Sequence, residues 1–160
     1  MLIALFACHL PTQNPKATSL NFPLTVLDKG TYSGFTEKEL SFMVIKEKQE
    51  FLKVFSMLHS IEILSPPPPP VDFKEKIVIV LLFGQKPTGG FSIDFGRTYL
   101  SPEGALSIEV KLKEPSPSSI LTQALTSPYA IAKIQKKGIK VIRFIDEKNN
   151  ILKELPLLNS

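Results

Sequence analysis

The sequence contains one cysteine, Cys8, and two histidines, His9 and His59, among its 160 residues. A single cysteine excludes an internal disulfide and a cluster of thiolate metal ligands. Neither histidine has a second histidine one helical turn away, the spacing that a metal-binding helix would provide. His9 lies in a proline-containing segment and His59 follows a predicted helix, so neither is placed as a catalytic base beside a nucleophile. We therefore expect no metal ion and no other cofactor.

A clustered basic surface is also lacking. The net charge is +4, and the excess of lysine and arginine lies in residues 71–160, where it is mixed with acids. Nucleic-acid binding favours basic side chains gathered on one face together with stacking aromatic residues. A carboxylate pair for acid–base catalysis is equally poorly supported, because Asp72 and Asp94 are the only acids near the central loop and Asp72 is typical of a turn or a cap. We expect a protein that is not an enzyme, binds no nucleic acid and has no small-molecule substrate.

The first residues are apolar but form only a short run. Met1–Ala7 is far shorter than the roughly twenty residues that span a bilayer. Leu5-Phe6-Ala7-Cys8 resembles a bacterial lipobox that lacks its basic upstream region, which predicts a truncated lipoprotein signal over residues 1–8 with Cys8 as the lipidated residue. The alternative is an ordinary small hydrophobic cysteine. Residues 9–21 have the composition of a flexible tether, and residues 22–160 are expected to form one β-rich domain. This organisation predicts a lipid-anchored protein of the bacterial cell envelope.

Residues 46–59 carry the one convincing helical pattern. Phe51, Phe55 and Leu58 recur at intervals of four and three residues, which predicts an amphipathic helix that packs on a sheet. Before it, Phe22–Val26 and Leu40–Ile45 are predicted strands, Asp28-Lys29-Gly30 is a predicted turn, and residues 31–35 are a short or bulged strand.

The central stretch runs from Val71 to Ile93. Its apolar run Ile77–Phe83 does not alternate, which predicts a strand covered on both faces, in the middle of a sheet and with the helix over one face. The glycine-rich loop Gly84–Gly90 then predicts a turn into the next strand of the same antiparallel sheet, with the glycines supplying positive φ angles.

The remaining sequence is rich in strand patterns. Residues 91–112 alternate with period two around a Ser-Pro-Glu-Gly turn, which predicts a hairpin with Phe91, Ile93, Phe95 and Tyr99 on its apolar face. Further strands are predicted over 126–134, 139–144 and 151–155. The fold class is therefore α+β: mainly antiparallel β, as a sandwich or a strongly curved sheet, with one amphipathic helix packed on it.

Four short motifs follow one another along the chain. They are Val71-Asp72-Phe73, Gly84-Gln85-Lys86-Pro87-Thr88-Gly89-Gly90-Phe91-Ser92-Ile93, Pro115-Ser116-Pro117 and Leu125-Thr126-Ser127-Pro128-Tyr129. In this order they resemble the C-terminal domain of the PrcB family of protease-complex subunits, over about residues 35–145. Phe91 departs from the tyrosine that is usual there, which removes a hydroxyl from that position. The resemblance implies a non-catalytic envelope lipoprotein that binds or stabilises a secreted protease as a complex subunit.

The predicted protein-binding residues lie in two segments. For the glycines and Tyr129 in these segments the alternative interpretation is structural, as turn residues and as a core aromatic residue. The alternative function is a loop-inserting inhibitor, because residues 87–91 are similar in shape to the binding loop of chagasin-type cysteine-protease inhibitors, with Lys86 in place of the asparagine. An inhibitor requires that loop to be exposed and rigid, whereas a scaffold can bury it. The candidates are Gln85, Lys86, Pro87, Thr88, Gly89, Gly90, Thr126, Ser127, Pro128 and Tyr129.

Overall fold

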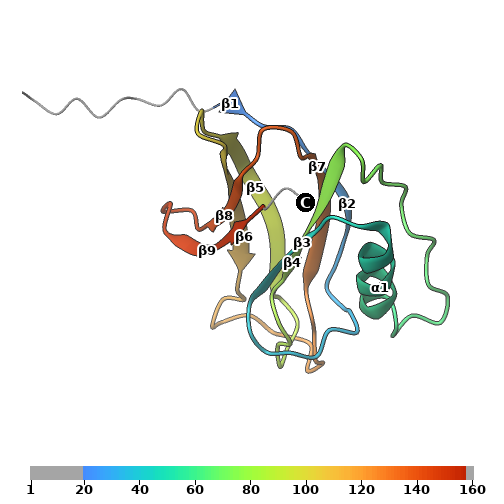
Figure 1. Ribbon diagram of the computed structural model, residues 1–160. Coiled ribbons are helices and arrows are strands. Elements are labelled where there is room, and N and C mark those ends of the chain that lie inside the picture. The colour runs from blue at the N-terminus through green and yellow to red at the C-terminus, as the bar shows by residue number, and fades with distance from the viewer. Residues whose placement is uncertain (1–19, 158–160) are drawn as a thin grey trace, which may run out of the picture.

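The computed structural model describes residues 20–157, which form two facing sheets and one helix (Figure 1). One sheet has the order β1-β5-β6-β8-β9 and the other β2-β7-β4-β3; every pair is antiparallel except β6–β8. The predicted α+β class, mainly antiparallel β with one helix, is confirmed, and of the two predicted arrangements the structure has the sandwich and not a single strongly curved sheet. The elements are β1 (Leu20–Asn21), β2 (Leu24–Gly30), β3 (Ser41–Ile45), α1 (Lys48–Leu58), β4 (Lys76–Leu82), β5 (Ser92–Leu100), β6 (Ala105–Lys113), β7 (Tyr129–Gln135), β8 (Val141–Ile145) and β9 (Ile151–Pro156).

Part of the predicted N-terminal organisation lies outside the described residues. These are the lipobox at Cys8 and residues 9–19 of the tether; the last two tether residues, Leu20 and Asn21, form β1 beside β5. Among residues 20–157, no helix has both the length and the apolar character needed to cross a membrane.

Strand β4 is dry on both faces, as its uninterrupted apolar sequence predicted. It lies between β7 and β3, and no residue from Ile77 to Leu82 is more than 1% exposed. Ile77, Ile79 and Leu81 point into the core between the two sheets, whereas the residues between them pack under α1. Burying an aliphatic side chain of this size contributes roughly 1.5–3 kcal/mol, so this strand is a major source of the fold's stability.

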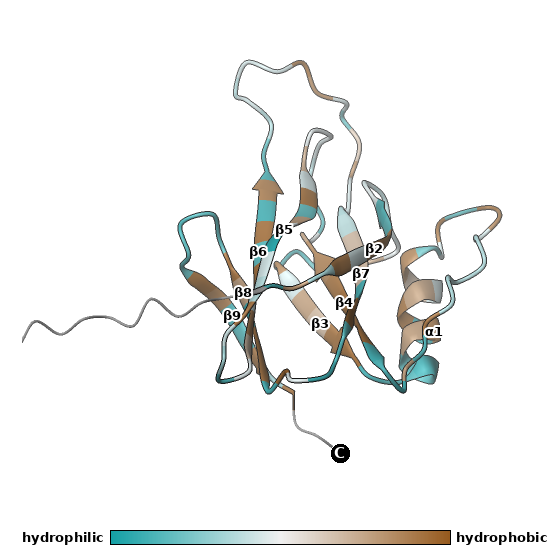
Figure 2. Ribbon diagram, turned by 90° about the horizontal axis from the view of Figure 1, so that it is seen from above, coloured by the Kyte–Doolittle hydropathy of each residue, from teal (hydrophilic) through white to brown (hydrophobic). Residues whose placement is uncertain are grey.

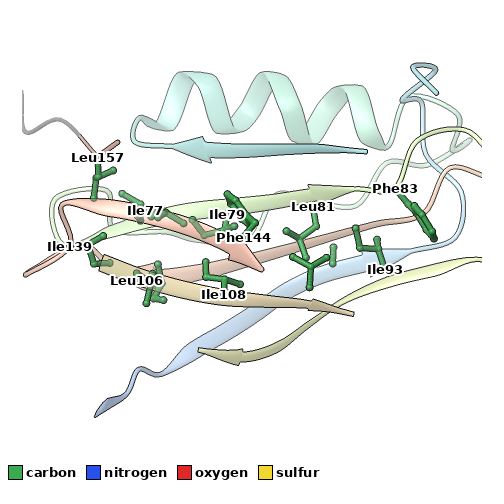
Figure 3. Close-up of a cluster of buried hydrophobic side chains, with 14 residues drawn as sticks. Ile77, Ile79, Leu81, Phe83, Ile93, Leu106, Ile108, Ile139, Phe144 and Leu157 are labelled. Carbon is green, nitrogen blue, oxygen red and sulfur yellow. The ribbon is translucent and has the colours of Figure 1, made fainter. Parts of the chain in front are cut away.

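The helix packs on the outer face of the four-stranded sheet, so the molecule has three layers (Figure 2). Its buried residues are Phe51, Val54, Phe55 and Leu58, which include all three members of the predicted stripe. Between the sheets, β4 faces side chains such as Leu106, Ile108 and Phe144 from the five-stranded sheet (Figure 3).

The prediction that residues 71–93 form two neighbouring strands of one sheet was wrong. Strand β4 belongs to the four-stranded sheet and β5 to the five-stranded sheet, so residues 83–91 cross from one layer to the other. Leu81 and Ile93 meet face to face within the core instead of lying on adjacent strands. The physical reason is that the pattern of apolar residues shows which face of a strand is buried. It does not show whether that strand pairs with the preceding strand in one sheet or lies opposite it in the other sheet.

Two β-bulges account for further errors. The predicted hairpin exists as β5 and β6, but the pairing of the two strands shifts between Phe95 and Thr98. As a result Thr98 is buried, and Tyr99 does not lie on the apolar face as predicted: its hydroxyl is 3.5 Å from Asn149. An inserted residue reverses the alternation of everything that follows it. In β2 the pairing shifts between Val26 and Asp28, so residues 28–30, which were predicted to form a turn, continue the strand. Residues 31–35, predicted as a short or bulged strand, form no strand.

The bulge of β5 covers a buried acid, Glu109 on β6. Its side chain accepts a 2.6 Å hydrogen bond from Nε of the exposed Arg97, and the residue is 4% exposed. That hydrogen bond is the main cause that lowers the pKa of Glu109 below its ordinary value of 4.5, and burial opposes it. A carboxyl with a lowered pKa stabilises the fold above the unfolded-state pKa, and this contribution disappears as the pH falls through the folded-state value.

We therefore expect Glu109→Gln to be less stable than the wild-type chain at about pH 7, because a carboxylate partner of Arg97 is lost. The difference in the free energy of unfolding should shrink as the pH falls below 4.5, because the wild-type carboxyl then becomes protonated and is neutral like the glutamine amide. Urea unfolding of both proteins between about pH 7 and pH 3 measures this difference. A difference that is constant over the whole range would contradict the assignment.

Candidate functional site

The two segments predicted to bind a partner lie side by side at one end of the sandwich. The connections β2–β3, β4–β5 and β6–β7 all gather there, at the bottom of Figure 1. The Lys86 amide donates to the Thr126 carbonyl at 2.7 Å, and the Thr126 amide donates back to the Lys86 carbonyl at 2.9 Å. We call residues 83–91 and 114–128 together the loop end.

Further hydrogen bonds hold the 83–91 loop along its length. The Gln85 amide donates to the Glu37 carbonyl at 2.8 Å, and the Gly89 amide donates to the Thr122 carbonyl at 3.0 Å. The Thr126 hydroxyl donates to the carbonyl of Thr88 at 2.8 Å. Because its backbone groups are paired with both the β2–β3 and the β6–β7 connections, the loop is a preformed surface whose ordering costs little free energy on binding.

The candidate residues divide into supports and surface. Thr126, Ser127, Pro128 and Tyr129 are all buried. The Ser127 hydroxyl, for example, donates to the Phe35 carbonyl at 2.7 Å. Thr126 and Pro128 support the loop directly, because their carbonyls accept hydrogen bonds from the amides of Lys86 and Phe83.

The loop residues themselves reach the surface to different degrees. Pro87 and Gly90 are exposed, and Gln85, Lys86, Thr88 and Gly89 are half-buried. The surface that the candidates offer to a partner is therefore centred on the 85–90 loop.

An aromatic pair shapes the base of this loop. The Lys86 ammonium lies 4.3 Å from the ring centroid of Phe83 and 5.8 Å from that of Phe91, within the range of a cation–π interaction. The two rings meet edge to face at 5.8 Å. Phe91 thus packs at the base of the loop through its ring, a role for which a tyrosine hydroxyl is not needed.

Two glycines have a required geometry. Gly84 has φ 82°, and a Cβ there would collide with the Lys38 carbonyl. Gly90 has φ 89°, and a Cβ there would lie 2.8 Å from Pro115 and 3.1 Å from Leu121. The second pair of contacts shows that the β6–β7 connection packs directly on the 83–91 loop at Gly90.

Sequence reasoning missed the exposed apolar residues of that connection. Ile120 is fully exposed and Leu125 is 63% exposed, and both lie in the connection whose Thr122 and Thr126 are hydrogen-bonded to the 83–91 loop. The sequence signal was available, because isolated large aliphatic residues within a serine- and proline-rich loop have no local core to enter.

A polar cluster on the helix side of the four-stranded sheet was also missed. His59 is 3% exposed; its Nε2 lies 2.8 Å from Asp28 Oδ2 and its Nδ1 lies 2.5 Å from Glu62 Oε1. The Tyr129 hydroxyl donates to the same Asp28 oxygen at 2.9 Å.

Tyr129 therefore has a structural role. Burial, followed by the hydrogen bond to Asp28, raises the pKa of Tyr129 well above its ordinary value, so the phenol remains a proton donor. The cluster ties β2, β7 and the end of α1 together. Predicting a turn at residues 28–30 concealed it, because a turn would have placed Asp28 in solvent.

Residues 77–135, which run from β4 through β7, match the family model described as PrcB C-terminal. The family predicted from the motifs is thus confirmed over this segment, which contains the whole loop end. No curated protein and no solved structure matches the chain.

The bracing of the loop end makes a prediction about its glycines. Gly84→Ala should lower the free energy of unfolding by about 1–2 kcal/mol from the left-handed backbone alone, and by more because the methyl group meets the Lys38 carbonyl. Gly89→Ala is the matched control. Its Cβ would lie 3.6 Å from Thr122, an ordinary contact, and we expect a change within about 0.5 kcal/mol. Urea denaturation compares the two, and equal effects would contradict the assignment.

Proposed function

We propose that this protein is a non-catalytic subunit of the bacterial cell envelope that binds or stabilises a secreted protease through its loop end. The match of residues 77–135 to the PrcB C-terminal family supports a role in association with a protease. The proposal that the loop end is the binding surface rests on the structure of that surface.

The main observation is a rigid loop bordered by exposed apolar side chains. Pro87 at the tip, Ile120 and Leu125 are exposed, while the Lys86–Thr126 bridge fixes the backbone beneath them. Large apolar side chains on a preordered backbone favour association with a protein, because they gain burial without a large loss of conformational entropy.

The state of His59 supports the absence of catalysis. A histidine base must reach a substrate or a nucleophile with one ring nitrogen. Here the ring is buried, and both nitrogens face the carboxylates of Asp28 and Glu62. Of the two histidines, it is the one whose surroundings the structure describes.

Inhibition by loop insertion is the second candidate function, and the same rigidity favours it. The 85–90 loop is braced from below with Pro87 and Gly90 exposed, as insertion into an active-site cleft requires. The two functions differ in what happens to the activity of the bound protease.

Titration of the full chain against papain-like and subtilisin-like proteases, following complex formation and protease activity, tests the proposal. We expect a stable complex with undiminished activity. Ile120→Ser and Leu125→Ser should weaken it at least about tenfold, equivalent to about 1.4 kcal/mol. Ile63→Ser and Leu64→Ser are matched controls, since both residues are highly exposed in the connection after α1. If these controls weaken binding equally, the loop end is not the binding surface.

The outcome also separates the two functions. Tight inhibition that is lost in Thr88→Ala and Gly89→Ala would favour the inhibitor. Binding to neither class of protease would contradict both functions.

We also propose that Cys8 carries the lipid anchor. Metabolic labelling with a radioactive or clickable fatty acid should label the full-length precursor but not its Cys8→Ser variant. Equal labelling of both proteins, or labelling of neither, would contradict this anchor.

A further inference from the structure

The described part of the fold leaves several strand edges without a neighbouring strand. The four-stranded sheet ends at β2 and β3, and the five-stranded sheet ends at β1 and β9, with most of β5 extending past the two-residue β1. An unpaired edge presents backbone donors and acceptors that can pair with another chain, and proteins usually protect such edges with charges, prolines or bulges.

Three of these edges carry such protection. Strand β2 has a bulge after Val26, and its Lys29 forms a 2.6 Å ion pair with Asp94 of β5. Strand β5 has its own bulge before Thr98. Strand β9 contains Lys153 and ends in Pro156.

Strand β3 is different. Ser41-Phe42-Met43-Val44-Ile45 contains no charge and no proline, and it pairs with β4 over all five residues without a shift in register. It has no backbone hydrogen bond to the described chain besides those of the β4 ladder. In an antiparallel strand, half of the N–H and C=O groups point to each side, so β3 has one set that faces away from β4.

The open part of β3 extends from Ser41 to Val44. These four residues are half-buried, whereas Ile45 is fully covered. Phe42 and Val44 pack at the rim of the core between the sheets, where the Phe42 ring stacks on that of Phe144 at 4.4 Å. An added strand could therefore extend both the hydrogen-bond ladder and the apolar rim of the core.

The charges around β3 disfavour a second copy of this chain as the added strand. In a two-fold antiparallel pair, opposite side chains share a face, so the two residue numbers add to an even number. Pairing centred on Met43 brings Glu39 toward Glu47 of the copy, and pairing centred on Phe42 brings Lys38 toward Lys46. Like charges opposite one another destabilise a strand pair. Pairing centred on Val44 or beyond needs the covered backbone of Ile45, and pairing centred on Ser41 or before sets β3 against residues 38–40, which lie outside the strand.

We propose that β3 is a strand-addition site for an extended segment of another protein. The segment is uncharged over about four residues and apolar at alternate positions. In the antiparallel orientation it carries an acidic residue at its start, beside Lys46, and a basic residue at its end, beside Glu39. This site lies outside the loop end and does not depend on it.

Two peptides test the site with the full chain as the receptor. The first peptide has six residues of alternating valine and threonine, preceded by a glutamate and followed by a lysine. The second is identical except for N-methyl groups at alternate positions, which remove donors while keeping the side chains. Fluorescence anisotropy measures binding, and amide hydrogen exchange reports on residues 41–44.

We expect the first peptide to bind and to slow exchange at residues 41–44. The methylated peptide should bind at least tenfold more weakly, and Ser41→Lys, which adds a charge to the edge, should weaken binding of the first peptide. Equal binding of both peptides, or binding without slower exchange at these residues, would overturn strand addition. No binding would overturn it as well, as would concentration-dependent dimerisation that by itself protects these amides.

Discussion

The fold depends on the burial of β4 on both faces. A strand with apolar side chains pointing both ways needs a layer on each side, and the two layers here are the five-stranded sheet and α1. Residues Ile77–Leu82 therefore join the two hydrophobic clusters into one continuous structure. Such a strand cannot lie at an edge, where water would reach it, and this places β7 and β3 on either side of it.

The same constraint shapes the loop end. Because β4 is central in one sheet and β5 belongs to the other, the chain must cross between layers within residues 83–91. The crossing begins with the left-handed Gly84 and is then fixed by the Lys86–Thr126 bridge. The loop is rigid because it connects two packed sheets, and that rigidity is available to a binding function without further stabilisation.

The sequence was informative wherever a residue's surroundings follow from local periodicity. The stripe of Phe51, Phe55 and Leu58 and the unbroken run of β4 both predicted their environments correctly. It was uninformative about bulges, because one extra residue near Gly96 moves Tyr99 from the inner to the outer face while leaving the composition unchanged. It was equally uninformative about which sheet a strand joins, since Leu81 and Ile93 are apolar in either arrangement.

For the candidate site, the motifs predicted two segments that prove to be neighbours in the fold, but not which of their residues are buried. Thr126 and Ser127 are small and polar, which at a surface suggests recognition, yet here both are buried and their hydroxyls donate to the carbonyls of Thr88 and Phe35. Burial of a polar residue depends on whether distant carbonyls, such as that of Phe35, lie within reach. Sequence spacing carries no information on such partners, whereas the exposed Ile120 and Leu125 need none. In this domain, apolar residues that have no core to enter therefore indicate a candidate surface from the sequence alone, whereas the burial of the polar motif residues follows only from the fold.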